Sequence, residues 1–305
     1  MSDSDLEKSK SFLALYSVDI WKLSKAVFEE CKKNELITRA SAIAFTGMIT
    51  AVPFLALILT VAVYCIPDQN IGGTPDFTGS MMAQIEQMSG KVIPDEAATI
   101  IQNQITRLQS QPKAAILSTG VFVTIWLSSN LFISVIDALN KIYGVAESRP
   151  YWKLRLIAAF MAIVQSVIII ATVSAIVAYP FVVDLLGLSF YQASIATLVT
   201  WSLSFMMVLL TFAITFQVGP SVKRKDKYVL PGSIFGTLGF LATTYGFRLY
   251  VENSSRYDAM YGSLGGVMVL MIWFYLSSFV LLLAGQINKY FMQRRYAMKN
   301  TEMDD

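Results

Sequence analysis

The chain has 305 residues, of which 55% are hydrophobic and only 15% are charged, and its mean hydropathy is +0.54. This composition is too apolar for an ordinary water-soluble domain. The formal net charge is only +3 and there is no histidine, which argues against nucleic acid as a partner and excludes histidine-based hydrolases and zinc sites. The sequence therefore predicts an all-α integral membrane protein.

The N-terminal segment, residues 1–39, mixes acidic and basic residues and precedes the first apolar run, so we predict that it is cytoplasmic. Within it, residues 12–33 repeat apolar side chains at helical spacing with lysines around them. Such an amphipathic helix would lie along the membrane surface. A helix packed on the cytoplasmic ends of a bundle has the same periodicity, so both interpretations stay open.

Six charge-free runs are each long enough to cross a hydrocarbon core of about 30 Å. They cover residues 40–67, 114–136, 156–183, 185–222, 228–247 and 259–288. We therefore predict a six-span membrane domain at 40–288 and a cytoplasmic tail at 289–305. The long segment 67–113 between spans 1 and 2 contains amphipathic stretches and is expected to form an external helical cap.

Lys and Arg gather before span 1, between spans 2 and 3, between spans 4 and 5, and after span 6. By the positive-inside rule, both termini are then cytoplasmic. The basic run 223–227 fits an anchor for this orientation, and binding of anionic lipid is the alternative. Cys31 and Cys65 flank span 1 and should face different compartments, which excludes a disulfide between them.

Two spans contain residues that disturb a plain apolar helix. Pro53 lies in the middle of span 1 and should kink it, with Thr46 and Thr50 placed to satisfy freed carbonyls; the kink could instead open a cavity. Asn130 lies near the centre of span 2 and must face the bundle interior. It either makes a structural hydrogen bond between helices or lines a polar route, and Gln165 in span 3 raises the same question.

The ends of the spans carry further candidate residues. Gly144 suits a helix C-terminus, and the stretch that follows it ends in a basic, aromatic belt that includes Arg155. Arg248 and Glu252 lie one helical turn apart and could pair at the outer interface. The entrance to span 6 is rich in hydroxyls and small residues: Tyr257, Tyr261, Gly262, Gly265 and Gly266. Close helix packing is the favoured interpretation of this entrance, and a ligand site is the alternative.

Three motifs resemble the YihY/BrkB family of bacterial inner-membrane proteins. They are Ala138-Leu-Asn-Lys-Ile-Tyr-Gly-Val145 with Arg149-Pro-Tyr-Trp-Lys-Leu-Arg155, the small-residue stretch before Pro53, and a closing signature from Tyr257 to Asn288. The likeness covers residues 36–290. It implies a role in the bacterial envelope, with some members linked to the export of lipopolysaccharide precursors or to serum resistance. Gln286 stands where family members often have Glu, so no carboxylate is available there.

The family was long labelled ribonuclease BN, but the cytoplasmic loops contain no cluster of acids that would hold Mg²⁺ for a nuclease. We therefore expect no enzyme, cofactor or metal site. The leading hypothesis is translocation of a lipid or amphiphile, with membrane lipids and lipopolysaccharide precursors as candidate partners. The rival is a non-transporting scaffold for envelope partners, and a homo-oligomer stays open. The candidate substrate-path or packing residues are Pro53, Asn130, Asn140, Tyr143, Arg155, Arg248, Tyr257, Tyr261, Gly262 and Gly265.

Overall fold

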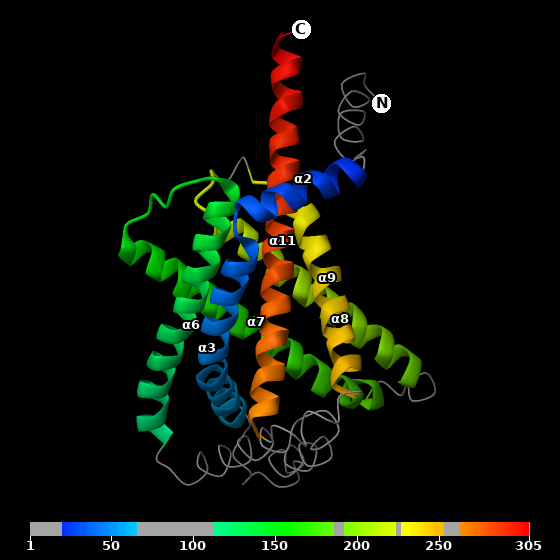
Figure 1. Ribbon diagram of the computed structural model, residues 1–305. Helices are drawn as coiled ribbons and strands as arrows, with labels where there is room; N and C mark the ends of the chain where they lie inside the picture. Colours follow the sequence, from blue (N-terminus) through cyan, green and yellow to red (C-terminus); the bar gives the residue numbers. More distant parts are fainter. Residues whose placement is uncertain (1–19, 66–112, 186–191, 224–226, 253–262, 305) are drawn as a thin grey trace.

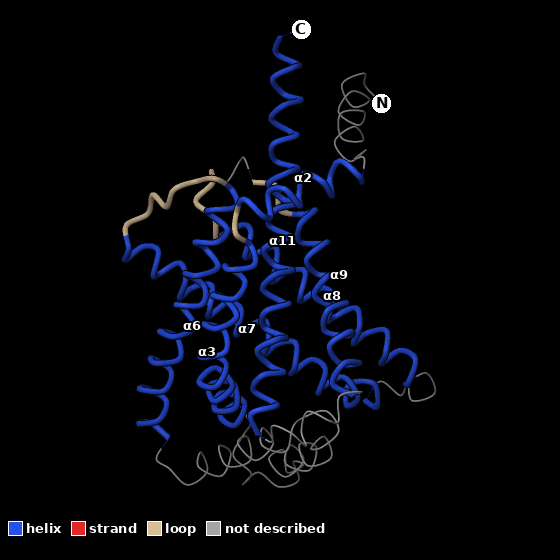
Figure 2. Tube along the Cα trace, viewed as in Figure 1, coloured by secondary structure: helices blue, strands red, loops and turns tan. Residues whose placement is uncertain are grey.

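The computed structural model describes residues 20–65, 113–185, 192–223, 227–252 and 263–304. In these ranges all regular structure is helical, and Figure 2 shows helices joined by loops with no strand. The helices are α2 (Ile20–Lys33), α3 (Leu36–Cys65), α6 (Lys113–Tyr143), α7 (Tyr151–Leu185), α8 (Gln192–Val218), α9 (Leu230–Glu252) and α11 (Ser263–Asp304).

The helices form a bundle around α11, with α2 lying across one end of it (Figure 1). We call this end, which also carries the loop at 144–150 and the segments 219–223 and 227–229, the α2 end. The helix α11 packs mainly against α3 and α9, while α6, α7 and α8 follow one another around the bundle. Its last turns continue past α2 and project from the bundle (Figure 1).

Four helices contain stretches that are long and apolar enough to cross a membrane: Phe122–Tyr143, Tyr151–Thr172, Trp201–Val218 and Gly266–Ala297. These lie in the predicted spans 2, 3, 4 and 6, which confirms a multi-helix membrane protein. The helices α3 and α9 occupy the predicted spans 1 and 5, and the full count of six spans stays a prediction. The predicted external cap lies outside the described residues except for Lys113, which begins α6. The predicted boundary at 288 is not a break, because α11 runs through it.

Among the residues whose burial the structure describes, a buried core lies toward the α2 end. It joins residues of α3, α6, α8 and α11: Leu36, Ala40, Ile43, Val135, Ala138, Leu139, Ile142, Tyr143, Phe212, Phe216, Leu282 and Ala284. On α3 the apolar side chains of Phe45 and Ile49 are exposed instead. Exposed aliphatic and aromatic side chains on spanning helices are expected to face lipid, because the surroundings of a spanning helix are apolar lipid tails.

The helix α3 continues through Pro53, and hydroxyl groups of α3 and α6 donate to the carbonyls of α3 around it. Thr46 and Thr50 donate to the carbonyls of Ala42 and Thr46, each one turn earlier. From α6, the Thr124 hydroxyl donates to the Pro53 carbonyl at 3.1 Å. These contacts give the stretch around Pro53 a packing role, as threonines commonly have in membrane helices.

The place where α3, α6 and α11 meet is filled by side chains at the level of Gly47. A Cβ added to Gly47 would lie 3.2 Å from Phe274 of α11 and 3.7 Å from Leu131 of α6. Side chains thus fill the junction at this level. A cavity lies elsewhere among the described residues, beneath α2.

Candidate functional site

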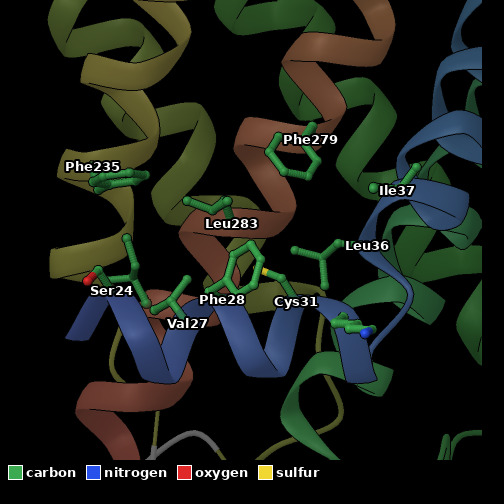
Figure 3. Close-up of a pocket in the computed structure, with 11 residues that line it drawn as sticks. Ser24, Val27, Phe28, Cys31, Leu36, Ile37, Phe235, Phe279 and Leu283 are labelled. Atoms are coloured by element: carbon green, nitrogen blue, oxygen red, sulfur yellow. The ribbon is translucent and has the colours of Figure 1, made fainter. Parts of the chain in front are cut away.

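The groove beneath α2 has a volume of about 740 Å³ and is formed by four helices (Figure 3). We call it the α2 groove. Phe28 and Cys31 of α2 point toward Leu283 of α11, and Phe235 of α9 and Ile37 of α3 stand at its sides. The lining residues are Ser24, Val27, Phe28, Cys31, Lys32, Leu36, Ile37, Phe235, Phe279, Leu283 and Ile287.

The α2 groove exists because α2 covers the bundle only in part. Val27 is buried against Ile287 and Phe291 of α11, whereas Phe28, one residue further, is 74% exposed. The lining positions of α2 follow helical spacing, so one apolar stripe faces the groove and the lysines lie around it. Burial raises the pKa of the Cys31 thiol, which keeps the thiol neutral in this apolar setting. The groove is therefore shaped for a hydrocarbon chain, with Lys32 among its lining residues.

An ion pair fastens α2 to α11. The Lys289 ammonium lies 2.5 Å from Oε2 of Glu30, and its hydrogen bond is the main reason why the pKa of Glu30 is lowered. Asn34 donates to the Glu30 carboxylate and to Oε1 of Gln286. Gln286 thus serves as an uncharged acceptor for Asn34. The amphipathic helix packs on the end of the bundle, as one of the two interpretations of its sequence predicted. Its position along a membrane surface stays a prediction.

Replacing Lys289 with methionine is expected to loosen α2 without disturbing the spans. The change keeps the apolar stem but leaves the half-buried Glu30 carboxylate without its closest cation, which typically costs about 1–3 kcal/mol. Hydrogen exchange of the amides in 20–33 should accelerate about ten-fold, while exchange in α6 stays unchanged. Lys33→Met is the matched control, because Lys33 lies 3.8 Å from the same carboxylate and its side chain is 77% exposed. Equal exchange in the two variants would contradict this role for Lys289.

Asn130 and Arg155, both predicted site residues, meet on the outer side of α6. Nη1 of Arg155, in the first turns of α7, donates to Oδ1 of Asn130 at 2.5 Å. The guanidinium carbon of Arg155 lies 3.7 Å from the centroid of the Trp126 ring. Trp126 is 49% exposed, so Asn130 faces α7 at the edge of the bundle. The sequence had predicted that Asn130 faces the bundle interior. We call Trp126, Asn130 and Arg155 the arginine cluster.

Asn140, another predicted site residue, belongs to a polar network that closes the α2 end. Its side chain donates to Oε2 of Glu147 at 2.8 Å and accepts from the Ser221 amide at 2.7 Å. Glu147 also accepts from the Ser221 hydroxyl and binds Arg149 through both carboxylate oxygens. Arg149 donates in turn to the Gly219 carbonyl. The network ties the loop after α6 to the loop after α8, which is a structural role.

This network favours the charged form of Glu147. Its hydrogen bonds from Arg149, Ser221 and Asn140 lower its pKa to about 2. Gly144, where the helix ends, has a φ of 68°, and the amides of Gly144 and Val145 donate to the carbonyls of Lys141 and Asn140. This is the glycine C-cap that the sequence predicted, and it turns the chain toward Glu147.

Tyr143 is buried in the core, where it interacts with the Asn288 side chain of α11. Asn288 accepts the Gly232 amide of α9 at 2.7 Å, and its Nδ2 has no hydrogen bond among the described residues. Gly232 permits the close approach: a Cβ there would lie 2.3 Å from the Ala284 carbonyl oxygen. Tyr143 therefore lies at a junction of α6, α9 and α11, away from the α2 groove.

The other predicted site residues are not drawn into one site. Arg248 is exposed near the end of α9 and has an interaction partner, and Gly265 lies in the first turn of α11. Tyr257, Tyr261 and Gly262 lie outside the described residues. Sequence reasoning missed the groove residues Phe28, Ile37 and Leu283. The apolar stripe of α2 was visible in the sequence, but its partner surface on α9 and α11 was not.

Comparison with known proteins identifies relatives of this chain and its family. The chain is 27% identical to the ribonuclease-like protein YfkH of Bacillus subtilis, over 89% of this chain and 95% of that protein. It is 24% identical to a UPF0761 membrane protein of Alteromonas mediterranea, over 92% of each chain, and 24% identical to one of Aeromonas salmonicida, over 85% of each. No solved structure matches. The Virulence factor BrkB family matches residues 27–305, and the chain therefore belongs to this family of membrane proteins.

Proposed function

We propose that this protein binds a lipid or similar amphiphile of the bacterial inner membrane in the α2 groove and moves its polar end across the bilayer during envelope biogenesis. One observation carries the proposal: a groove of about 740 Å³, lined almost wholly by apolar side chains, lies between a surface helix and three helices of the bundle. Lipid-binding sites need an apolar surface that is wide enough for an acyl chain and reachable from the membrane.

The charges around the groove fit an amphiphile with an anionic head. Lys32 is among the lining residues, and Lys25 and Lys33 are exposed on the same helix. We place both termini, and with them the α2 end, in the cytoplasm, because the basic segments favour that orientation. The groove would then receive lipids from the cytoplasmic leaflet, where anionic headgroups attract basic surface helices. Lipopolysaccharide precursors belong to this chemical class.

We also propose that the protein acts without catalysing a covalent reaction. The name of the relative YfkH describes it as ribonuclease-like. Within the part of the chain that the structure describes, no group of three or more Cys, Asp or Glu side chains could hold a metal ion. Two carboxylates near the α2 end, Glu30 and Glu147, are engaged by Lys289 and Arg149. These engagements support structural roles for both acids.

Filling the groove is the sharpest test of transport. Purified protein is reconstituted into phospholipid vesicles that contain a fluorescent phospholipid or a labelled lipid A precursor, and an impermeant reductant bleaches the outer leaflet. Wild-type protein is expected to accelerate flipping. Ile37→Trp should lower the rate about ten-fold, because the larger ring occupies the groove and opposes chain entry by more than about 1 kcal/mol. Ile37 is 65% exposed, so the substitution does not disturb the core.

Ile49→Trp is the matched control, since Ile49 lies on the same helix, is 50% exposed and does not line the groove. Equal flipping by the two variants would show that lipids do not pass through the groove. No acceleration by the wild type would favour the scaffold. The polar network of Asn140, Glu147 and Ser221 supports that rival, because it fixes the loops at the α2 end in one arrangement.

A further inference from the structure

Among the described residues, no acidic side chain pairs with Arg155, in contrast to three other basic groups. Arg39 pairs with Asp137, Arg149 with Glu147, and Lys289 with Glu30. For Arg155, the described residues supply one amide oxygen, on Asn130, and one aromatic face, on Trp126. Its Nε is buried and has no hydrogen bond among the described residues. The guanidinium therefore keeps its positive charge and unused donors.

The arginine cluster lies deeper along α6 than the charged end of that helix. We place the edge of the hydrocarbon region at Asp137, because its carboxylate is charged and its side chain is 74% exposed. Asn130 comes seven residues earlier, so the cluster lies about 10 Å further toward the bilayer centre. A charged side chain in the hydrocarbon region costs up to about 3 kcal/mol. An anionic ligand would offset part of that cost.

An open apolar hollow of about 240 Å³ lies on the surface of α6 beside the cluster. Among the described residues it is bounded by Phe122, Val123, Trp126 and Leu127 of this one helix. Phe122, Trp126 and Asn130 follow at intervals of four residues and thus share one face of the helix. The Phe122 and Trp126 rings stack with centroids 6.3 Å apart, and Phe122 is 66% exposed. Cationic donors stand at one end of this face and an apolar surface at the other.

The geometry points to a binding site for an anionic phospholipid, whose phosphate is held by Arg155 and whose acyl chain lies along Trp126 and Phe122. Guanidinium donors match phosphate oxygens in geometry and in charge. Trp126 keeps one guanidinium face covered, and Asn130 fixes the orientation of Nη1. The direction of the face, with the donors nearer the α2 end, suits a lipid with its head on that side. This site is separate from the α2 groove, and binding to it does not require transport.

Lipid retention after purification tests the site. Detergent-washed protein is incubated with phosphatidylglycerol or phosphatidylcholine of the same chain length, and bound lipid is counted by native mass spectrometry. Wild-type protein should retain phosphatidylglycerol preferentially. Arg155→Gln should lower that retention about ten-fold, the loss expected for one charge-assisted contact of about 1.4 kcal/mol. Retention of phosphatidylcholine should not change.

Arg295→Gln is the matched control, because Arg295 also lies over an aromatic ring, Tyr228, at 5.6 Å, but belongs to the exposed last part of α11. It should retain phosphatidylglycerol as the wild type does. Equal loss in both variants would reduce the effect to net charge and overturn the site. Millimolar inorganic phosphate should not displace the lipid, and complete displacement would assign the cluster to a soluble anion instead.

Asn130→Asp gives a second test that does not depend on the folding of Arg155→Gln. The new carboxylate would take the place of the amide oxygen beside Nη1 of Arg155 and supply the missing counter-ion from within the protein. The fold should be retained, because the aspartate keeps an acceptor oxygen for Arg155 and adds an ion pair. Retention of phosphatidylglycerol should fall as in Arg155→Gln. Retention at the wild-type level would overturn the proposal.

Discussion

Gly232→Ala is expected to destabilise the protein by about 3 kcal/mol or more, because the added methyl group has no space to enter. A Cβ at this position would lie 2.3 Å from the Ala284 carbonyl oxygen and 2.5 Å from Cγ of Asn288. The first neighbour is helix backbone and the second belongs to a fully buried side chain, so neither can move cheaply. The helices α9 and α11 must separate, and the bond from the Gly232 amide to Asn288 is then lost.

The measurement is the free energy of unfolding in mixed micelles, with the thermal midpoint in detergent as a second readout. Gly246→Ala is the matched control on the same helix, since a Cβ there meets nothing within 4 Å. Its effect should stay within about 1 kcal/mol, the size of the helix-propensity difference between the two residues. A Gly232→Ala variant as stable as Gly246→Ala would mean that α9 and α11 do not pack as described.

Glu147→Gln is expected to cost about 2 kcal/mol at neutral pH, since glutamine cannot accept from Asn140, Ser221 and Arg149 together and leaves the Arg149 charge unpaired. The carboxylate side chain is 24% exposed, so water screens part of the interaction. The two loops that Glu147 joins should then exchange amide hydrogens faster. Asp137→Asn is the control, because its ion pair with Arg39 is at a carboxylate with a 74% exposed side chain, and such pairs contribute less than about 1 kcal/mol.

The pH dependence of this difference has a definite sign. The pKa of Glu147 is about 2 in the folded protein, against an ordinary value of 4.5. Because the pKa is lower in the folded protein, the unfolded chain binds the proton at a higher pH than the folded protein does. The stabilisation is therefore complete above about pH 5 and is lost as the pH falls toward 2. The stability gap between wild type and Glu147→Gln should therefore narrow over this range. A gap that is constant between pH 7 and pH 3 would assign the effect to shape and not to charge.

Much of the fold could be predicted because the bilayer restricts what a spanning segment can be. A charge-free run such as 156–183 has to satisfy its backbone internally, and it forms part of the helix α7 as expected. The C-cap at Gly144 was also predictable, because a positive φ favours glycine and the residues before it are helical. These inferences depend on local sequence alone.

The rotation of each helix about its axis could not be predicted in the same way. A span that is apolar all round gives no stripe from which to infer its partners. Asn130 clearly needed a hydrogen-bonding partner, but Arg155 lies beyond a loop whose path decides where α7 begins. The α2 groove was hidden for a similar reason, because it depends on which side of α11 the surface helix docks through Glu30 and Lys289. Asn140 and Tyr143 lie in the last turn of α6, which continues past the predicted end of span 2 at residue 136, and their neighbours give them structural surroundings.

The helix α11 has 42 residues and is thus about 63 Å long, roughly twice the thickness of a hydrocarbon core. Its final turns project from the bundle as a straight helix (Figure 1). A small membrane protein gives little contrast for aligning particles in electron cryomicroscopy. A helical fusion that continues α11 in phase would carry a rigid fiducial marker, and would offer a practical route to an experimental density for the α2 groove.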